Sequence, residues 1–257
     1  MAQQCSLSSH AFYKGETIEY DLFFKWGIIN SKAGLATFTT KSAQYNSKEA
    51  WEYKLFFNSI GMLDKLFKIK DTLTTYFSPD AKLLYSDKRS NEGGYYLIDE
   101  LTFTPTAAKS VVKSRRYTPT TTKIDTVITA DGCLYDMMST ILCLRSIDWK
   151  SLKQNAEYPY QVVVGRDIVN IRFRYTGQSV VEPNDRLKYR THHFFIDVYD
   201  PAFTQSKEAA EVWVGDDDNH IPVRVRAKLK IGAAEVYFKD SNNLQYPFTC
   251  RIVIPSK

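Results

Sequence analysis

The sequence predicts a mainly β protein, built on a large antiparallel sheet that curls or closes into an open barrel. Segments with an apolar residue at every second position follow one another along the whole chain, separated by turn residues, and suggest roughly a dozen or more strands. One segment, at about residues 131–146, instead has apolar residues spaced three and four apart, which is typical of a helix. Strands and helices do not alternate, so a parallel sheet is not expected. A sheet this large must protect its edges, which favours curling or closure around or against the helix.

Residues 17–28 show the strand pattern most clearly. Their apolar side chains on one face are Ile18, Tyr20, Leu22, Phe24, Trp26 and Ile28. Before the helix we expect further strands at residues 35–41, 51–58, 68–77, 83–89, 95–104, 109–117 and 123–129. After it we expect them at residues 158–164, 168–175, 186–199, 211–215, 221–231, 233–238 and 248–254. Residues 61–67 are apolar but ambiguous, either a loop or a short helical turn that covers one end of a barrel.

The central helix is expected to begin at Asp131, whose carboxylate can accept hydrogen bonds from the free N–H groups of the first turn. It should end near Arg145, where a positive charge suits the negative pole of the helix. Its apolar face must be buried against the sheet, either inside the curl or outside it. A short second helical piece is expected within residues 147–155.

Length and composition are those of an ordinary globular protein. The chain has 257 residues, of which 44% are apolar and 25% are charged, and we expect one domain from residue 12 to residue 257. Residues 1–11 are expected to be a flexible segment left after signal removal, because Ala2-Gln3-Gln4 resembles a signal-peptidase site. No apolar run is long enough to span a bilayer, so the mature chain should be soluble or peripheral. The net charge of +5 is too small to imply nucleic acid.

The four cysteines leave the disulfide state open. In a helix, Cys133 and Cys143 would lie ~15 Å apart along the axis, too far for a disulfide. Cys5 and Cys250 could join the two ends of the chain in an oxidising compartment. We favour four unpaired, mostly buried thiols. No cysteine or histidine spacing indicates a metal site, and no cofactor is expected.

Two groups of side chains are candidate binding sites. The first is a set of aromatic residues on the strand faces, which would line either a solid core or a cavity for one apolar ligand: Tyr20, Phe24, Trp26, Trp51, Tyr53 and Phe57. The second is a ladder of cations on one face of the strand at residues 221–231: Arg224, Arg226, Lys228 and Lys230. The ladder could hold an anion, although a solvated strand face is the commoner role for such residues.

Short fragments in a fixed order make the chain resemble a family of bacterial envelope proteins, the domain of unknown function 3108. The fragments are Phe12, Gly15-Glu16, Tyr20, Trp26-Gly27, Ala33-Gly34, Asp136 to Ser139, Leu144-Arg145, Trp213, Asp216-Asp217, Ile221-Pro222-Val223 and Gly232. The resemblance implies a mostly antiparallel β protein exported by Gram-negative bacteria to the periplasm or the outer envelope. It implies no activity. Asp136, Ser139 and Arg145 match the family pattern best, and we interpret them as a structural network that orients the helix on the sheet.

Three functions remain open at this point. The first is a non-enzymatic envelope protein that binds an apolar or amphipathic, lipid-like molecule in a cavity. The second is a scaffold with a solid sheet that binds another envelope protein or a glycan. The third, least favoured, is a hydrolase, since no Ser/His/Asp set is evident. A continuous cavity would separate the first function from the second. The oligomeric state is not indicated.

Overall fold

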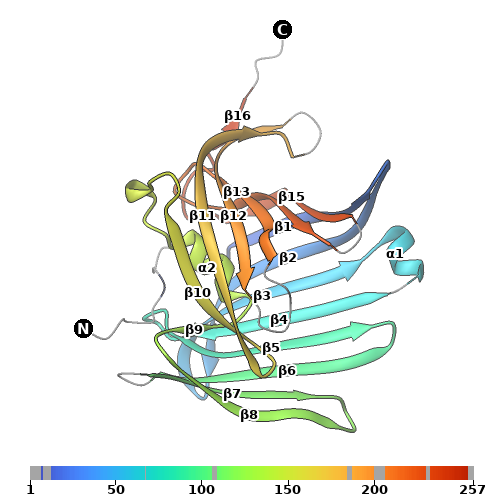
Figure 1. Ribbon diagram of the computed structural model, residues 1–257, viewed down its shortest axis with the longest axis vertical. Coiled ribbons are helices and arrows are strands. Elements are labelled where there is room, and N and C mark those ends of the chain that lie inside the picture. Colours follow the sequence, from blue (N-terminus) through green and yellow to red (C-terminus); the bar gives the residue numbers. More distant parts are fainter. Residues whose placement is uncertain are drawn as a thin grey trace.

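A computed structural model of the protein describes residues 7, 13–66, 68–105, 109–183, 187–199, 206–229 and 232–253. Within these residues sixteen strands belong to one sheet (Figure 1). The strands are β1 (Thr17–Trp26), β2 (Ile29–Tyr45), β3 (Lys48–Ser59), β4 (Ile69–Phe77), β5 (Leu83–Glu92), β6 (Tyr95–Pro105), β7 (Lys109–Tyr117), β8 (Thr122–Asp131), β9 (Leu134–Tyr135), β10 (Glu157–Val164), β11 (Asp167–Val181), β12 (Lys188–Tyr199), β13 (Ser206–Gly215), β14 (Pro222–Lys228), β15 (Ala233–Asn242) and β16 (Arg251–Ile252). The helical pieces are α1 (Gly61–Leu66), α2 (Ser139–Arg145) and the 3-10 turn Trp149–Ser151.

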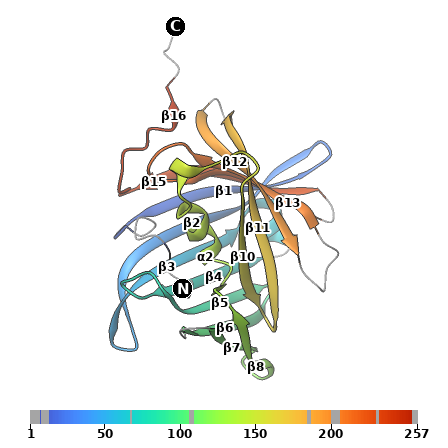
Figure 2. The ribbon, with the colours of Figure 1, turned by 60° about the vertical axis from the view of Figure 1, so that its left-hand side comes forward.

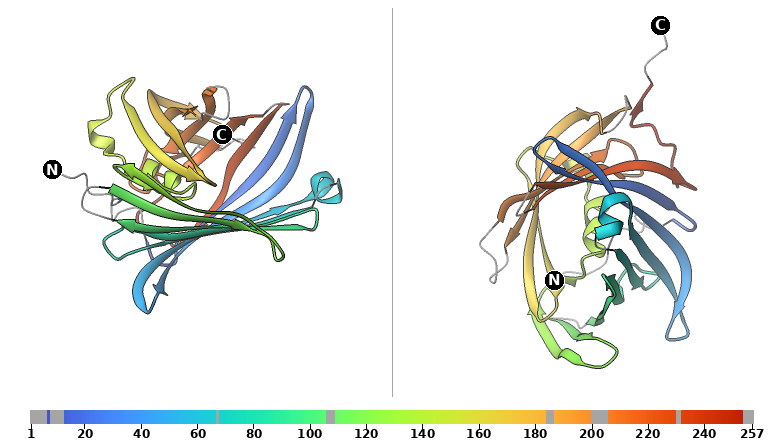
Figure 3. Two further views of the ribbon diagram at one scale, coloured as in Figure 1. Left: turned by 60° about the horizontal axis from the view of Figure 1, so that its bottom comes forward. Right: turned by 90° about the vertical axis from the view of Figure 1, so that its right-hand side faces the viewer.

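The sheet is a nearly closed, barrel-like meander. Its order is β8-β7-β6-β5-β4-β3-β2-β1-β15-β14-β13-β12-β11-β10-β9, with β16 paired to β12. Strand β1 lies near the middle of this order and pairs antiparallel with both β2 and β15, so the two ends of the chain meet there. Figures 2 and 3 show the sheet curling around α2, which lies inside the curl. The predicted fold class is therefore confirmed, and the position of the helix, which the sequence left open, is resolved.

The two ends of the sheet approach each other without joining the strand order. Strand β8 ends one side, and the short β9 ends the other by a parallel pairing with β10. A side-chain hydrogen bond bridges this seam. The Ser114 hydroxyl on β7 donates to the carbonyl of Gly165, between β10 and β11, at 2.5 Å.

The strand predictions hold over most of the chain because alternating burial imposes period two on the sequence. The structure differs mainly at strand ends. Strand β2 covers residues 29–45 instead of 35–41. The expected strand at residues 248–254 contains only β16 within the described residues. All described strands share one sheet, as one domain would require, although the domain boundaries stay a prediction.

The central helix is shorter than predicted. It covers Ser139–Arg145, while Asp131 ends β8 and Leu134–Tyr135 forms β9. Residues 131–138 therefore do not belong to the helix, and Asp131 is not its N-cap. Leu134 and Tyr135 are both buried, but they are held by the edge of β10 instead of by helical hydrogen bonds. The expected second helical piece is the 3-10 turn at Trp149–Ser151.

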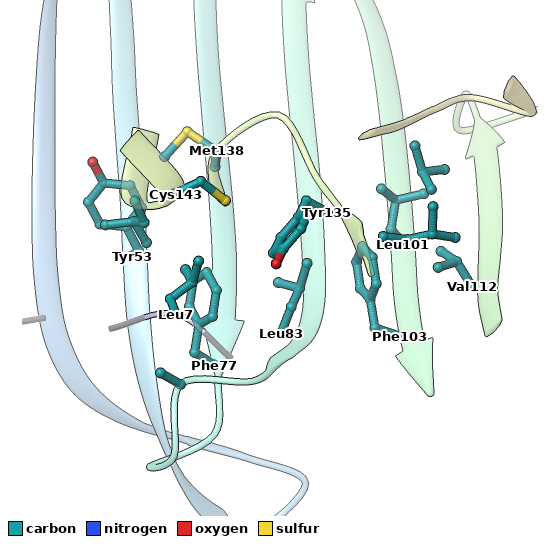
Figure 4. Packing of buried hydrophobic residues seen from close by; sticks show 14 of the residues in the cluster. Leu7, Tyr53, Phe77, Leu83, Leu101, Phe103, Val112, Tyr135, Met138 and Cys143 are labelled. Carbon is teal, nitrogen blue, oxygen red and sulfur yellow. The ribbon is translucent and has the colours of Figure 1, made fainter. Parts of the chain in front are cut away.

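Helix α2 divides the interior of the curl. One side of it packs into the largest apolar cluster, whose strand residues come from β3 to β10 (Figure 4). Leu142, Cys143 and Met138 belong to this cluster, whereas Leu144 packs into a second cluster formed by β11, β12 and β13. Leu7 also packs into the first cluster and donates its N–H to the Ala81 carbonyl at 3.0 Å. At this one described residue the expected flexible segment is fixed against the core.

The cysteine expectations are wrong in two respects. Cys133 forms a disulfide, and its partner lies outside the described residues, as does Cys5. Cys143 and Cys250 are free and buried. The proposed Cys5–Cys250 bridge is therefore contradicted, and so is the preference for four unpaired thiols. Cys133 and Cys143 do not pair, as predicted, but the reasoning from a common helix fails because Cys133 precedes it.

Among the described helices, none combines the length and the apolar character needed to cross a membrane. Residues 61–66 adopt α1, one of the two forms expected for that stretch. Figure 1 shows α1 at one end of the molecule, next to the ends of β3 and β4.

Candidate functional site

The N-terminus of α2 is anchored by a reciprocal pair of hydrogen bonds between Asp136 and Ser139. The backbone N–H of Ser139 donates to the Asp136 carboxylate at 2.9 Å, and the N–H of Asp136 donates to the Ser139 hydroxyl oxygen at 3.1 Å. The pair closes the turn that leads into the helix, whose own N-cap residue, Met138, makes no side-chain cap. The second carboxylate oxygen of Asp136 accepts from the Thr75 hydroxyl on β4 at 2.7 Å. All three residues are buried, so this contact ties the helix start to the sheet.

The C-terminus of α2 is anchored by a buried ion pair. The guanidinium of Arg145 donates to both carboxylate oxygens of Glu16, at 2.7 and 2.8 Å, and its Nε donates to the Asn219 carbonyl at 3.2 Å. The side chains of Arg145 and Glu16 are only 4% and 2% exposed. Bidentate geometry of this kind offsets part of the large cost of burying two charges. These contacts thus link three segments of the chain: Glu16 lies just before β1, Arg145 in the interior helix, and Asn219 in the β13–β14 connection.

Tyr20 and Tyr53 lie close to this ion pair and stay neutral. Burial raises the pKa of both phenols well above its usual value, and the electrostatic influence of Arg145 lowers it only in part. For Arg145 itself, burial lowers the pKa, but Glu16 more than compensates and the net shift is upward. At neutral pH the cluster therefore contains one cation and one anion beside two protonated phenols.

An apolar cavity of about 260 Å³ lies against the side of α2 that faces away from the largest cluster. Its walls come from α2 and from strands on both sides of β1, and its lining residues are Ile18, Tyr20, Phe38, Tyr53, Thr140, Ile141, Leu144, Arg145, Phe173, Ile196, Val212, Pro222, Val225 and Val236. Arg145 is the one charged residue among them, and its charge is already matched by Glu16. The cavity can therefore hold an apolar group but offers no free charge to a ligand.

The structure separates the six aromatic residues predicted to line a cavity. Tyr20 and Tyr53 line it. Phe57 packs outside it, in the cluster around Ile18 and Tyr20, and Trp51 packs at the margin of the largest cluster. Phe24 is half-buried, and Trp26 is 56% exposed at the end of β1. Alternation along β1 identified the inward face correctly, but it could not show where along the strand the interior ends.

The predicted cation ladder is largely neutralised. Arg224 makes a bidentate contact with Glu235 at 2.9 and 3.1 Å, and Arg226 lies 3.6 Å from the same carboxylate. Glu235 is only 2% exposed and pairs across the strands with Arg226. Lys228 is exposed, and Lys230 lies outside the described residues. Because two of the four cations share one buried carboxylate, we do not propose an anion site there.

A line of polar groups near the 3-10 turn places a hydroxyl, an imidazole and a carboxylate in sequence. Both ring nitrogens of His192 are hydrogen-bonded: Nδ1 lies 2.9 Å from the Tyr175 hydroxyl, and Nε2 lies 3.0 Å from the Asp216 carboxylate. Trp149 stacks on His220 with ring centroids 4.3 Å apart. Tyr175 and His192 are both buried, and their hydrogen bonds tie β11 and β12 to the β13–β14 connection. In the described part of the chain, no group of three potential ligands could hold a metal ion.

Sequence reasoning missed Glu16 and Asn219 as partners of Arg145. Glu16 stands in one of the fragments that carry the family resemblance, but nothing near it in the sequence indicates a buried partner. Asn219 follows three aspartates between two predicted strands, and this polar context gives no sign of a buried partner. Its side-chain nitrogen donates to the carbonyls of Tyr246 and Pro247, so it also fastens the segment that follows β15.

Comparison with known proteins supports the fold but not a particular activity. No curated protein matches the chain. A solved structure from Brucella abortus, a beta-barrel-like protein of domain of unknown function DUF1849, is 13% identical, with a TM-score of 0.61, covering 90% of this chain and 98% of that one. At this identity the match concerns the fold alone.

Two further solved structures cover 93% of this chain and all of their own. One is a Bacteroides fragilis protein described as exported, with a YmcC-like fold, 9% identity and a TM-score of 0.37. The other is a Parabacteroides distasonis protein described as a lipoprotein, with 8% identity and a TM-score of 0.35. Such low scores support no argument about this chain. The family model for a protein of unknown function, DUF3108, matches residues 19–239, and the chain therefore belongs to the DUF3108 family.

Proposed function

We propose that this protein is a non-enzymatic, exported protein of the bacterial envelope that holds an apolar or amphipathic molecule in the cavity beside α2. The observation that carries the proposal is the cavity itself: about 260 Å³ with aliphatic and aromatic walls. It is larger than the roughly 150 Å³ cavity that takes up benzene in an engineered protein. It lies just below the roughly 300–1,000 Å³ of sites for drug-sized ligands. A short acyl chain or a small ring system fits this size.

The polar groups at the cavity wall support a ligand with one weakly polar end. The Tyr20 and Tyr53 hydroxyls remain protonated because burial raises their pKa, so they can donate hydrogen bonds. Arg145 is neutralised by Glu16, which argues against a ligand that carries a full charge into the cavity. We therefore favour an apolar body with a hydroxyl, ester or carbonyl group.

Export is supported by the disulfide at Cys133, since disulfides persist in oxidising compartments such as the periplasm. We further propose that Asp136, Ser139 and Arg145 have a structural role. Their contacts to Thr75 and Glu16 hold α2 at both ends, at the distance from the sheet that leaves the cavity open.

The proposal can be tested by titrating the protein with N-phenylnaphthylamine, an uncharged probe that fluoresces in apolar sites. We expect saturable binding to the wild type. Ile141→Trp, which places a larger side chain at the cavity wall, should abolish it. The matched control is Val180→Trp, at a position 60% exposed on β11, which should bind like the wild type. Binding that survives in folded Ile141→Trp, or no binding to the wild type, would contradict the proposal.

A further inference from the structure

Two chain turns meet at one corner of the molecule. The β1–β2 connection, from Trp26 to Ile29, lies against the β14–β15 connection, which ends at Gly232. Gly232 has φ +75°, and a Cβ atom built there would lie 2.2 Å from the Lys25 carbonyl oxygen and 3.1 Å from the Trp26 Cβ. Only glycine allows this close approach. The N–H of Leu229 donates to the Gly232 carbonyl at 3.1 Å and closes the second turn.

This corner presents large apolar side chains to solvent. Trp26 is 56% exposed, Ile28 is fully exposed and Leu229 is 47% exposed. They come from two adjacent turns and so cover one surface, which we call the apolar corner. Clustered exposed apolar residues mark interaction or membrane sites more often than isolated ones do.

The charge around the apolar corner is predominantly positive. Residues 25–32, 61–70 and 228–232 together contain seven lysines and one aspartate, and counting the two carboxylates that pair with these lysines, Asp21 and Glu235, leaves a net +4. Lys65, Lys68 and Lys228 are exposed. The carboxylates close to this region are engaged. Asp64 accepts from the Ser59 hydroxyl at 2.8 Å, Asp21 pairs with Lys32 at 2.8 Å, and Glu235 is buried near Lys25.

Helix α1 extends the same end of the molecule. It packs beside β2, where the Ile60 N–H donates to the Ala33 carbonyl at 2.9 Å. Figure 3 shows the end of the β1–β2 hairpin and α1 projecting on the same side of the sheet. In sequence, residues 61–69 contain Lys65 and Lys68 among five apolar residues, together with Asp64. Such a mixture of lysine with bulky apolar residues is what peripheral segments use at a lipid interface.

We infer that the apolar corner and the lysines around it form a docking surface for an anionic lipid bilayer. Trp26, Ile28 and Leu229 would enter the level of the headgroups, while Lys65, Lys68 and Lys228 contact lipid phosphates. A bilayer is favoured over a protein partner because the exposed apolar side chains come from two turn tips and the exposed charges near them are lysines, which together complement acyl chains and anionic phosphates. This inference does not rest on the cavity, and each can fail without the other.

The test is cosedimentation of the full chain with vesicles. We expect binding to vesicles of equal parts phosphatidylglycerol and phosphatidylcholine, and little binding to phosphatidylcholine alone. Trp26→Ser together with Ile28→Ser should weaken binding about tenfold or more, and Lys228→Glu about tenfold. The matched controls are Val127→Ser, at a 61% exposed position on the outer strand β8, and Lys48→Glu, at the exposed start of β3 beside the opposite end of β2. Both should bind like the wild type.

Tryptophan emission gives a second readout. The other tryptophans, Trp51, Trp149 and Trp213, are less exposed than Trp26. Vesicle binding should therefore shift the emission to shorter wavelength in the wild type. Trp26→Phe should lose that shift while it still cosediments, because phenylalanine keeps the apolar contact. No cosedimentation of the wild type at low salt, equal binding to both vesicle types, or undiminished binding of the Trp26→Ser, Ile28→Ser variant would overturn the inference.

Discussion

Removing the carboxylate of Glu16 should destabilise the protein far more than removing a neighbouring surface carboxylate. Glu16→Ala leaves the guanidinium of Arg145 inside the protein without its anion, at a site where the side chain is only 4% exposed. Breaking a buried pair from one side typically costs about 3–5 kcal/mol, because the remaining charge keeps its desolvation cost and loses its partner. For a chain of this size each kcal/mol lowers the Tm by about 2–4 °C, so we expect a decrease of roughly 6–20 °C.

Glu19 provides the matched control. It lies three residues further along, and its carboxylate forms an ion pair of 2.7 Å with Lys239, but both side chains are at least 40% exposed. Exposed pairs contribute about 0–1 kcal/mol, so Glu19→Ala should leave the Tm nearly unchanged. Thermal unfolding followed by circular dichroism compares the two variants directly.

A double variant separates the pair from its surroundings. Replacing both partners, Glu16→Ala with Arg145→Met, removes both buried charges and should recover much of the stability that Glu16→Ala loses. The reasoning would be refuted if Glu16→Ala cost no more than Glu19→Ala. It would also be refuted if the double variant lost as much free energy of unfolding as the two single variants lose when their losses are added.

Three further outcomes follow from buried polar contacts. Thr75→Val removes the hydroxyl that donates to Asp136 and should lower the free energy of unfolding, measured in urea, by about 1–3 kcal/mol. Thr122→Val, at the exposed start of β8, should lower it little. An equal loss of stability in both variants would contradict the anchoring of α2. Burial raises the pKa of the Cys143 thiol, so the native protein should leave this cysteine unmodified by a thiol reagent at neutral pH and expose it only on unfolding, as mass spectrometry of the labelled peptides would report. Burial lowers the pKa of His220, so the unfolded state binds more protons than the folded state below about pH 6.5. The urea midpoint should therefore decrease as pH falls through that range, and His220→Gln should flatten the decrease.

The sequence predicted the fold class because burial on one face leaves a period of two in almost every strand. Residues 17–28 show this in β1, where Ile18 and Tyr20 are buried as the alternation indicates. The helix was extended too far because Leu134 happens to stand three and four residues before Met137 and Met138, as a helix would require. A two-residue strand leaves no periodic pattern, so β9 could not be recognised.

The site depended on contacts that local patterns do not contain. Arg145 and Glu16 are 129 residues apart, and Asp136 and Thr75 are 61 residues apart. Tyr20 and Tyr53 were identified because they lie on inward strand faces. Trp26 satisfies the same alternation but stands at the end of its strand, beyond the interior. The alternation of apolar residues shows which face of the sheet a side chain lies on, whereas its burial depends on where the neighbouring strands end.

The central claim, that the cavity beside α2 holds an apolar or amphipathic molecule, is tested most directly by native mass spectrometry. The protein would be produced with an export signal, purified without detergent, and measured under native and then denaturing conditions. The account predicts an added mass of lipid-like composition that is lost on denaturation and is absent from Ile141→Trp. A clean mass for the wild type, unchanged after incubation with an envelope lipid extract, would contradict it.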